Sequence, residues 1–226
     1  MSKNRDDLSL QELLRNCVGA KNYLGVYVAS KLGGDVGYEK VICVSWQRFG
    51  NINLAITMAD PKMVALLVEL GAEVSIDDVE YAASIYFMTN SSSSKCDEGF
   101  KIKRSDNALE ILQLFYDIGV DTSSLETSCP MLRSHVSYEA LIRFENFLLD
   151  LRGAQPEKPE FDFTYFELCF NEIADEYAFD FDGVIECPES LYHKLESGFY
   201  GLNPDALYQQ VDDSVSEDMV ELLGLE

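Results

Sequence analysis

The chain has 226 residues, with 40 Asp or Glu against 17 Lys or Arg, which gives a net charge of −23 at pH 7. Hydrophobic residues make up 47% of it, which predicts a folded protein with a large core rather than a disordered one. The charge predicts that the protein repels nucleic acid and anionic membranes and attracts basic proteins. The polar start, residues 1–7, and the lack of a long apolar run predict a cytoplasmic protein without a secretory signal or membrane span.

The first elements that we expect are two helices, over residues 10–17 and 23–32, before Gly33. The run at residues 41–44 is β-branched and too short for a stable helix, so it predicts an extended finger or strand. Exposed aromatic side chains anchor protein interfaces, and three of them flank this run. These candidates for partner binding are Tyr38, Trp46 and Phe49.

Residues 50–74 predict two short helices back to back. Asp60 and Pro61 mark the start of the second helix, because Asp caps helix N-termini and proline fits the first turn. Apolar residues then recur at three- and four-residue spacing as far as Leu70, and Gly71 ends the helix in a left-handed cap. A helix pair this small cannot bury its apolar stripe alone, so stacked copies are expected.

The same ending, apolar residues followed by glycine, recurs along the chain, at Gly33, Gly71, Gly119 and Gly153. In this feature residues 9–154 resemble the ankyrin-repeat family, whose units of about 33 residues are stacked helix pairs. The resemblance implies a mostly α-helical fold with an ankyrin-like stack, and a groove for partners built from helix faces and fingers. The chain departs from the family's usual Thr-Pro-Leu-His start, which reads Gly-Asn-Ile-Asn at residues 50–53.

Further helices are expected over residues 79–88, 108–118 and 138–151, and residues 89–99 are predicted to form a polar loop. The chain's one basic cluster lies at this loop: Lys95, Lys101, Lys103 and Arg104. In so acidic a protein we expect these cations to pair with the protein's own carboxylates, although contact with an acid or a nucleic acid is an alternative.

Two prolines among polar residues at 156–159 mark the best domain boundary. We therefore predict an ankyrin-like domain at residues 1–154 and a small acidic α-helical segment at 155–226. The second segment holds 19 Asp or Glu against two Lys, a net charge of −17. An aromatic stripe from Phe166 to Tyr177 predicts a helix there. The candidates for an acidic binding surface are Asp175, Glu176, Asp180, Asp182, Glu186 and Glu189.

Asp180-Phe181-Asp182-Gly183 resembles the nucleophile motif of haloacid-dehalogenase-type phosphatases, in which two Asp residues carry the chemistry and help to hold magnesium. Only 43 residues follow Gly183, too few for that family's sheet and later motifs. Residues 178–189 also resemble an EF-hand loop, but Ala178 stands where the first Asp ligand belongs. We expect an Asp-Gly turn without metal or cofactor, and weak calcium binding is the alternative.

The chain has six scattered cysteines, no Cys-x-x-Cys pair and two histidines, which predicts buried free thiols rather than a zinc site. We find no phosphate-binding loop, no dinucleotide fingerprint and no nucleophile with a nearby base, so we expect no enzymatic activity. These absences favour a protein whose function is binding.

We therefore expect a non-enzymatic protein-binding module that inhibits a basic partner, either a toxin or a nucleic-acid-processing enzyme. Such a protein would be an immunity protein, an antitoxin or an anti-defence nucleic-acid mimic. The alternative is an ankyrin-type adaptor or effector scaffold, in which the charge only keeps the protein soluble. A continuous ridge of carboxylates favours the inhibitor, and an even scatter favours the adaptor. The oligomeric state is left open.

Overall fold

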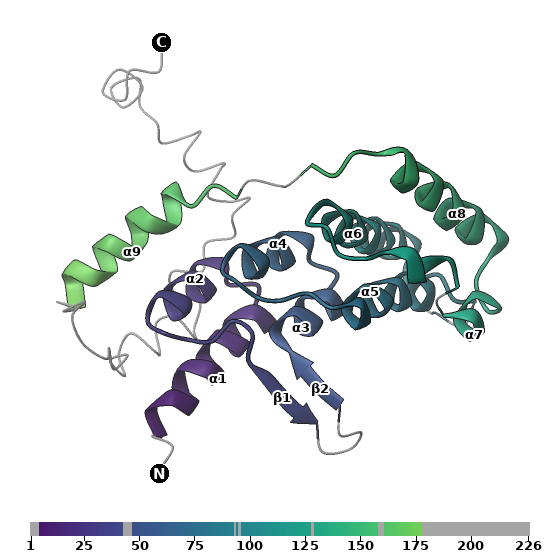
Figure 1. Cartoon of the computed structure of the whole chain (residues 1–226). Coiled ribbons are helices and arrows are strands. Elements are labelled where there is room, and N and C mark those ends of the chain that lie inside the picture. Colours follow the sequence, from purple (N-terminus) through teal and green to yellow (C-terminus); the bar gives the residue numbers. More distant parts are fainter. Residues whose placement is uncertain are drawn as a thin grey trace. The chain divides into compact units, whose positions relative to one another are not determined.

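The structure is a computed structural model that describes residues 5–42, 47–92, 94, 96–127, 129–157 and 161–177. These residues are mostly α-helical, as predicted (Figure 1). Contacts divide the chain into two units, Met1–Gly34 with Thr164–Glu226, and Asp35–Phe163. The predicted boundary between domains at residues 1–154 and 155–226 stays a prediction.

The first unit contains α1 (Arg5–Gly19), α2 (Tyr23–Lys31) and α9 (Thr164–Tyr177). Helices α1 and α2 pack as a pair, and α9 packs against α2. The ring of Tyr27, which is fully buried, lies 5.5 Å from that of Phe166 and 6.3 Å from that of Phe170. The stripe predicted for α9 is confirmed at these positions, because aromatic burial holds it against α2. The side chain of Tyr177 lies outside the described residues.

The second unit begins with a β-hairpin. Strands β1 (Glu39–Ile42) and β2 (Gln47–Gly50) pair antiparallel, with Glu39 opposite Gly50. This confirms the predicted extended structure at residues 41 and 42, and residues 43 and 44 of the predicted run lie outside the described residues. The hairpin leads directly into α3 (Asn51–Thr57). Asn51, at the start of that helix, is buried and donates a hydrogen bond to the carbonyl of Val36, which ties the helix to the chain before the hairpin.

Four helices follow the hairpin as two pairs. They are α3, α4 (Pro61–Glu69), α5 (Ile76–Thr89) and α6 (Glu98–Asp117). Helix α3 packs against α4 and α5, and α4 packs against α6, so the pairs lie side by side. The Asp60 side chain accepts from the backbone N–H of Met63 at 3.1 Å, which confirms the predicted cap. Gly71 and Gly119 follow α4 and α6 with φ of 99° and 85°, the left-handed conformation that only glycine adopts without strain.

The start of α6 differs from the sequence-based prediction. The helix begins at Glu98, ten residues before the expected start, because Asp97 caps it by accepting from the backbone N–H of Phe100. Most of the predicted basic cluster therefore lies on a helix. Cys96, just before it, is exposed, so the expectation of a buried thiol is wrong there. Cys17 is buried as expected.

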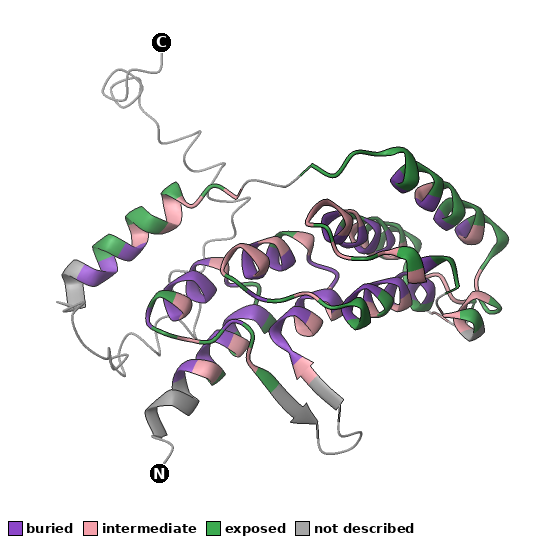
Figure 2. Ribbon diagram, viewed as in Figure 1, coloured by how far each residue is buried: buried purple, intermediate pink, exposed green. Residues whose placement is uncertain are grey.

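The second unit ends in a short 3₁₀ turn, η1 (Ser123–Glu126), and in α7 (Pro130–Arg133) and α8 (Tyr138–Gly153). The first two elements were not predicted. The fourth copy of the glycine ending is wrong, because Gly153 belongs to α8 and Ala154 after it is extended. Figure 2 shows α5 largely buried and α8 largely exposed. No helix among the described residues is long and apolar enough to cross a membrane.

Candidate functional site

The structure describes only part of the predicted binding residues. Asp175 and Glu176 lie in the last turn of α9, and their side chains are outside the described part of the chain. Asp180, Asp182, Glu186, Glu189 and Trp46 also lie outside it, as does the calcium-loop match at 178–189. The acidic surface formed by these residues stays a prediction. Tyr38 and Phe49 are described, and both are half-buried.

Phe49 lies at the root of the hairpin, where β2 meets the first helices of the two pairs. Its ring meets that of Tyr81 on α5 edge to face, with the centroids 6.1 Å apart. The Tyr81 hydroxyl in turn is hydrogen-bonded to Thr57 Oγ1 on α3 at 2.9 Å. These contacts join three elements into one surface, because an aromatic pair and a hydrogen bond both fix orientation.

We call this surface the hairpin face and define it by residues of β2, α3 and the solvent-facing row of α5. Its members are Phe49, Thr57, Asp77, Glu80, Tyr81, Ser84 and Met88. The α5 positions recur at spacings of three and four residues, so they lie on one side of the helix. Of this set, only Phe49 was among the residues predicted from the sequence.

A chain of polar contacts fixes the starts of α3 and α5 under the hairpin face. Asn53 Oδ1 accepts from the backbone N–H of Gly50 at 2.8 Å, and its Nδ2 donates to Asp78 Oδ1. The other oxygen of Asp78 accepts from the backbone N–H of Ser75 at 2.8 Å and from its hydroxyl at 2.7 Å. The two helix caps are therefore linked to each other.

The opposite end of α3 is fixed by α6. The Arg104 guanidinium donates to the carbonyl of Thr57, and Asn107 Nδ2 donates to the carbonyl of Ala59 at 2.8 Å. Arg104 thus binds a main-chain carbonyl rather than a carboxylate. Neither Lys101 nor Lys103 forms an ion pair with a described residue, and their expected pairing with the protein's own carboxylates stays a prediction.

Two negative charges lie on the hairpin face. Asp77 and Glu80 are exposed, and neither carboxylate has a hydrogen bond or ion pair with another described side chain. Among the described residues there is also no group of three or more His, Cys, Asp or Glu side chains placed to hold a metal ion. The face therefore presents an aromatic pair beside solvated carboxylates on a fixed support. That chemistry suits contact with a protein surface.

Comparison with protein-family models, with curated proteins and with solved structures finds no match. The function is therefore inferred from the charge and from the geometry of the described surfaces.

Proposed function

We propose that this protein is a non-enzymatic protein-binding module that inhibits a basic partner, a toxin or a nucleic-acid-processing enzyme. The observation that carries the proposal is the hairpin face, where the ring pair Phe49–Tyr81 lies next to the carboxylates of Asp77 and Glu80, which form no ion pair with another described residue. Aromatic side chains supply contact area at low entropic cost, and carboxylates orient cations of the partner. Little energy is needed to order this surface on binding, because its elements are already linked.

We further propose that the helix pairs of the second unit are an ankyrin-like stack. The pairs α3/α4 and α5/α6 lie side by side, each ends in a left-handed glycine, and a hairpin precedes the first pair. In such stacks the partner binds a groove that is built from helix faces and fingers. The hairpin face is built from those parts, which supports its assignment as the binding surface.

The charge of the chain supports a basic partner. Residues 155–226 carry a net charge of −17, and the whole chain carries −23. A field of this size accelerates encounter with a positively charged protein, and the effect weakens as salt screens it. Binding that is fast and sensitive to salt is therefore expected.

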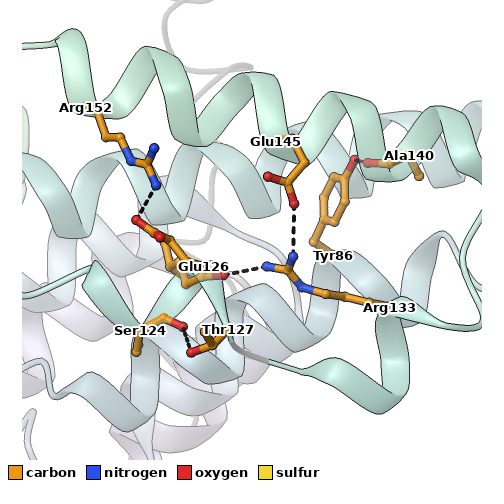
Figure 3. Close-up of polar contacts among 9 residues, drawn as sticks. Tyr86, Ser124, Glu126, Thr127, Arg133, Ala140, Glu145 and Arg152 are labelled. Carbon is orange, nitrogen blue, oxygen red and sulfur yellow. Dashed lines mark hydrogen bonds and ion pairs between the residues drawn. The ribbon is translucent and has the colours of Figure 1, made fainter.

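The ion pairs of the second unit favour a different candidate function, an ankyrin-type adaptor. Basic residues are interleaved with the acids around α8, in the ion pairs Arg133–Glu145 and Arg152–Glu126 (Figure 3). A further pair is Arg143–Asp106. The described acids around α8 are thus scattered and partly neutralised, unlike the continuous ridge expected of a nucleic-acid mimic. In the adaptor, partner choice would depend on the hairpin face alone, and its affinity would depend little on salt.

The test is binding of the full chain to a panel of purified basic nucleases, measured by biolayer interferometry at low and moderate salt together with nuclease activity. The double variant Asp77→Asn/Glu80→Gln is expected to weaken binding and inhibition about three- to tenfold, from two exposed charge contacts. Glu73→Gln is the matched control, since Glu73 is exposed and lies outside the face. Binding that ignores salt but is weakened by the double variant would reject the inhibitor and favour the adaptor. Binding that ignores both would reject the hairpin face as the binding surface.

A further inference from the structure

Helix α8 is attached to the second unit along one side only. Its buried residues form a single stripe, Ala140, Phe144, Leu148 and Leu151. The Phe144 ring is 4.7 Å from that of Phe87 and 5.2 Å from that of Tyr86, both on α5. This spacing of four, four and three residues covers one side of a helix and leaves the rest to solvent.

Polar contacts hold this attachment in a fixed orientation (Figure 3). The Arg133 guanidinium lies over the rings of Phe87 and Phe144, at 5.2 and 5.3 Å, and ion-pairs with Glu145 at 3.0 Å. It also donates to the carbonyl of Leu125 at 2.6 Å. Tyr86 donates to the carbonyl of Ala140 at 2.8 Å. A stacked, multiply bonded Arg lowers the cost of keeping a half-exposed helix in place.

The opposite side of α8 carries a row of exposed apolar residues. Tyr138, Ile142 and Leu149 are 73%, 42% and 61% exposed. Their spacing of four and seven residues places them on one line along the helix. The last helix of a repeat stack normally shows a polar outer face, since nothing further packs on it. An apolar row at this position therefore indicates a surface that a partner covers.

A second row, next to the apolar one, is acidic. The carboxylates of Glu139 and Asp150 are exposed and have no hydrogen bond or ion pair with other described side chains. Both also border a hollow of about 420 Å³ between α6 and α8, which Leu109 and Phe147 line from its apolar side. Arg143 in the same hollow is already paired with Asp106. The unpaired charge on this surface is thus negative.

We propose that the outer face of α8, made of Tyr138, Glu139, Ile142, Leu149 and Asp150, docks a basic amphipathic helix of a protein partner. The partner's apolar side chains cover the apolar row, and two of its cations meet Glu139 and Asp150. These carboxylates are eleven residues apart, about 16 Å along the helix, so the cations on a partner helix have the same spacing. The proposal rests on the proposed function in that the partner is basic and α8 ends a helical stack, and it uses a separate surface.

The charge on this face argues against a second copy of the chain as the occupant. A symmetric dimer places the same patch on both sides of the interface. Glu139 and Asp150 of one copy would then lie near the same two carboxylates of the other. Like charges at an interface oppose association. Lys or Arg of a different partner, placed opposite Glu139 and Asp150, favours association.

The experiment uses the full chain and displayed libraries of amphipathic helices of about eighteen residues, with varied apolar positions on one side. One library carries Lys at two positions eleven residues apart, and its matched control carries Glu there. Helices selected from the Lys library are expected to bind at least about tenfold more tightly than their Glu counterparts, and less tightly as salt rises. The charge reversal Glu139→Lys/Asp150→Lys is expected to invert this preference.

Two further variants separate this surface from others. Ile142→Asp/Leu149→Asp is expected to weaken the selected helices about tenfold or more, because it places charge in the apolar row. Phe100→Asp is its matched control, since Phe100 is 53% exposed on α6. The hairpin-face variant Asp77→Asn/Glu80→Gln is expected to leave helix binding unchanged. Loss of nuclease binding in that variant alone would bear on the hairpin face and not on the docking of a helix to α8.

Three results would overturn the inference. Lys and Glu libraries that yield equal affinities, or no binders, would exclude a basic helix. A dimer in the unaltered chain that Ile142→Asp/Leu149→Asp dissociates would show that a second copy covers the face. A large fall in the melting temperature of that variant, without dissociation, would show that the chain's own residues cover it.

Discussion

Helices α5 and α8 meet through the Phe87–Phe144 ring contact, yet they are held in opposite ways. Helix α5 packs against α3, α6, η1 and α7, so only one row of its side chains reaches solvent. Helix α8 buries one stripe, and one Arg stacked on two rings orients it. An interior helix is specified by packing on several sides, whereas an edge helix depends on a few contacts. Substitutions should therefore act globally at α5 and locally at α8.

The largest effect is expected from Phe144→Ala. Phe144 is fully buried and contacts both Tyr86 and Phe87, so its removal leaves a cavity in the buried stripe that helps to hold α8. We expect a loss of about 3–5 kcal/mol in the attachment of α8. Hydrogen exchange is the measurement, since α8 amides should lose protection while α3 and α5 keep theirs. Phe147→Ala, at a half-buried position, is the control. Loss of protection throughout the second unit would show that α8 is not a separate edge element.

Asp78→Ala, on the interior helix α5, is expected to reduce stability less. Its carboxylate accepts hydrogen bonds from Asn53 and Ser75 and links the caps of α3 and α5. Hydrogen bonds to a charged group are worth about 1.5–3 kcal/mol, so a loss of about 2–3 kcal/mol in unfolding free energy is expected. Denaturant titration of the double-mutant cycle with Asn53→Ala measures the coupling, expected near 1 kcal/mol. Zero coupling would contradict the linkage between the caps.

The parts of the fold that were predicted correctly depend on local signals. The Asp60 cap, Pro61, and the glycines at 71 and 119 each act within one helix turn, and the structure confirms them. The start of α6 was missed because Asp97 and Glu98 lie in a polar stretch that also suits a loop. Gly153 was assigned wrongly because an apolar residue before glycine does not by itself require a left-handed ending.

The candidate surfaces were harder to predict because they depend on contacts between distant residues. Phe49 was named from its aromatic character, but its partner Tyr81 lies on another element, 32 positions later. No pattern within α5 shows that Asp77 remains unpaired while Asp78, next to it, bonds to α3. The exposed row on α8 has a detectable signal, since Tyr138, Ile142 and Leu149 repeat at helical spacing off the buried stripe.

The smallest effect concerns the bond that crosses from α5 to α8. Tyr86→Phe removes the hydroxyl that donates to the carbonyl of Ala140, so a loss of about 1 kcal/mol in unfolding free energy is expected at neutral pH. Burial raises the pKa of Tyr86 above its usual 10.0, and the nearby charge of Arg143 opposes part of this. Below pH 10 the phenol is neutral in both states, so the stabilisation is complete. Above pH 10 the unfolded chain loses the phenol proton at a lower pH than the folded protein does. Stability therefore falls with rising pH until the pH passes the pKa of Tyr86 in the folded state. Denaturant titrations between pH 8 and 11 should show the wild type losing more stability than Tyr86→Phe, and parallel pH profiles would show that Tyr86 ionises freely in the folded protein.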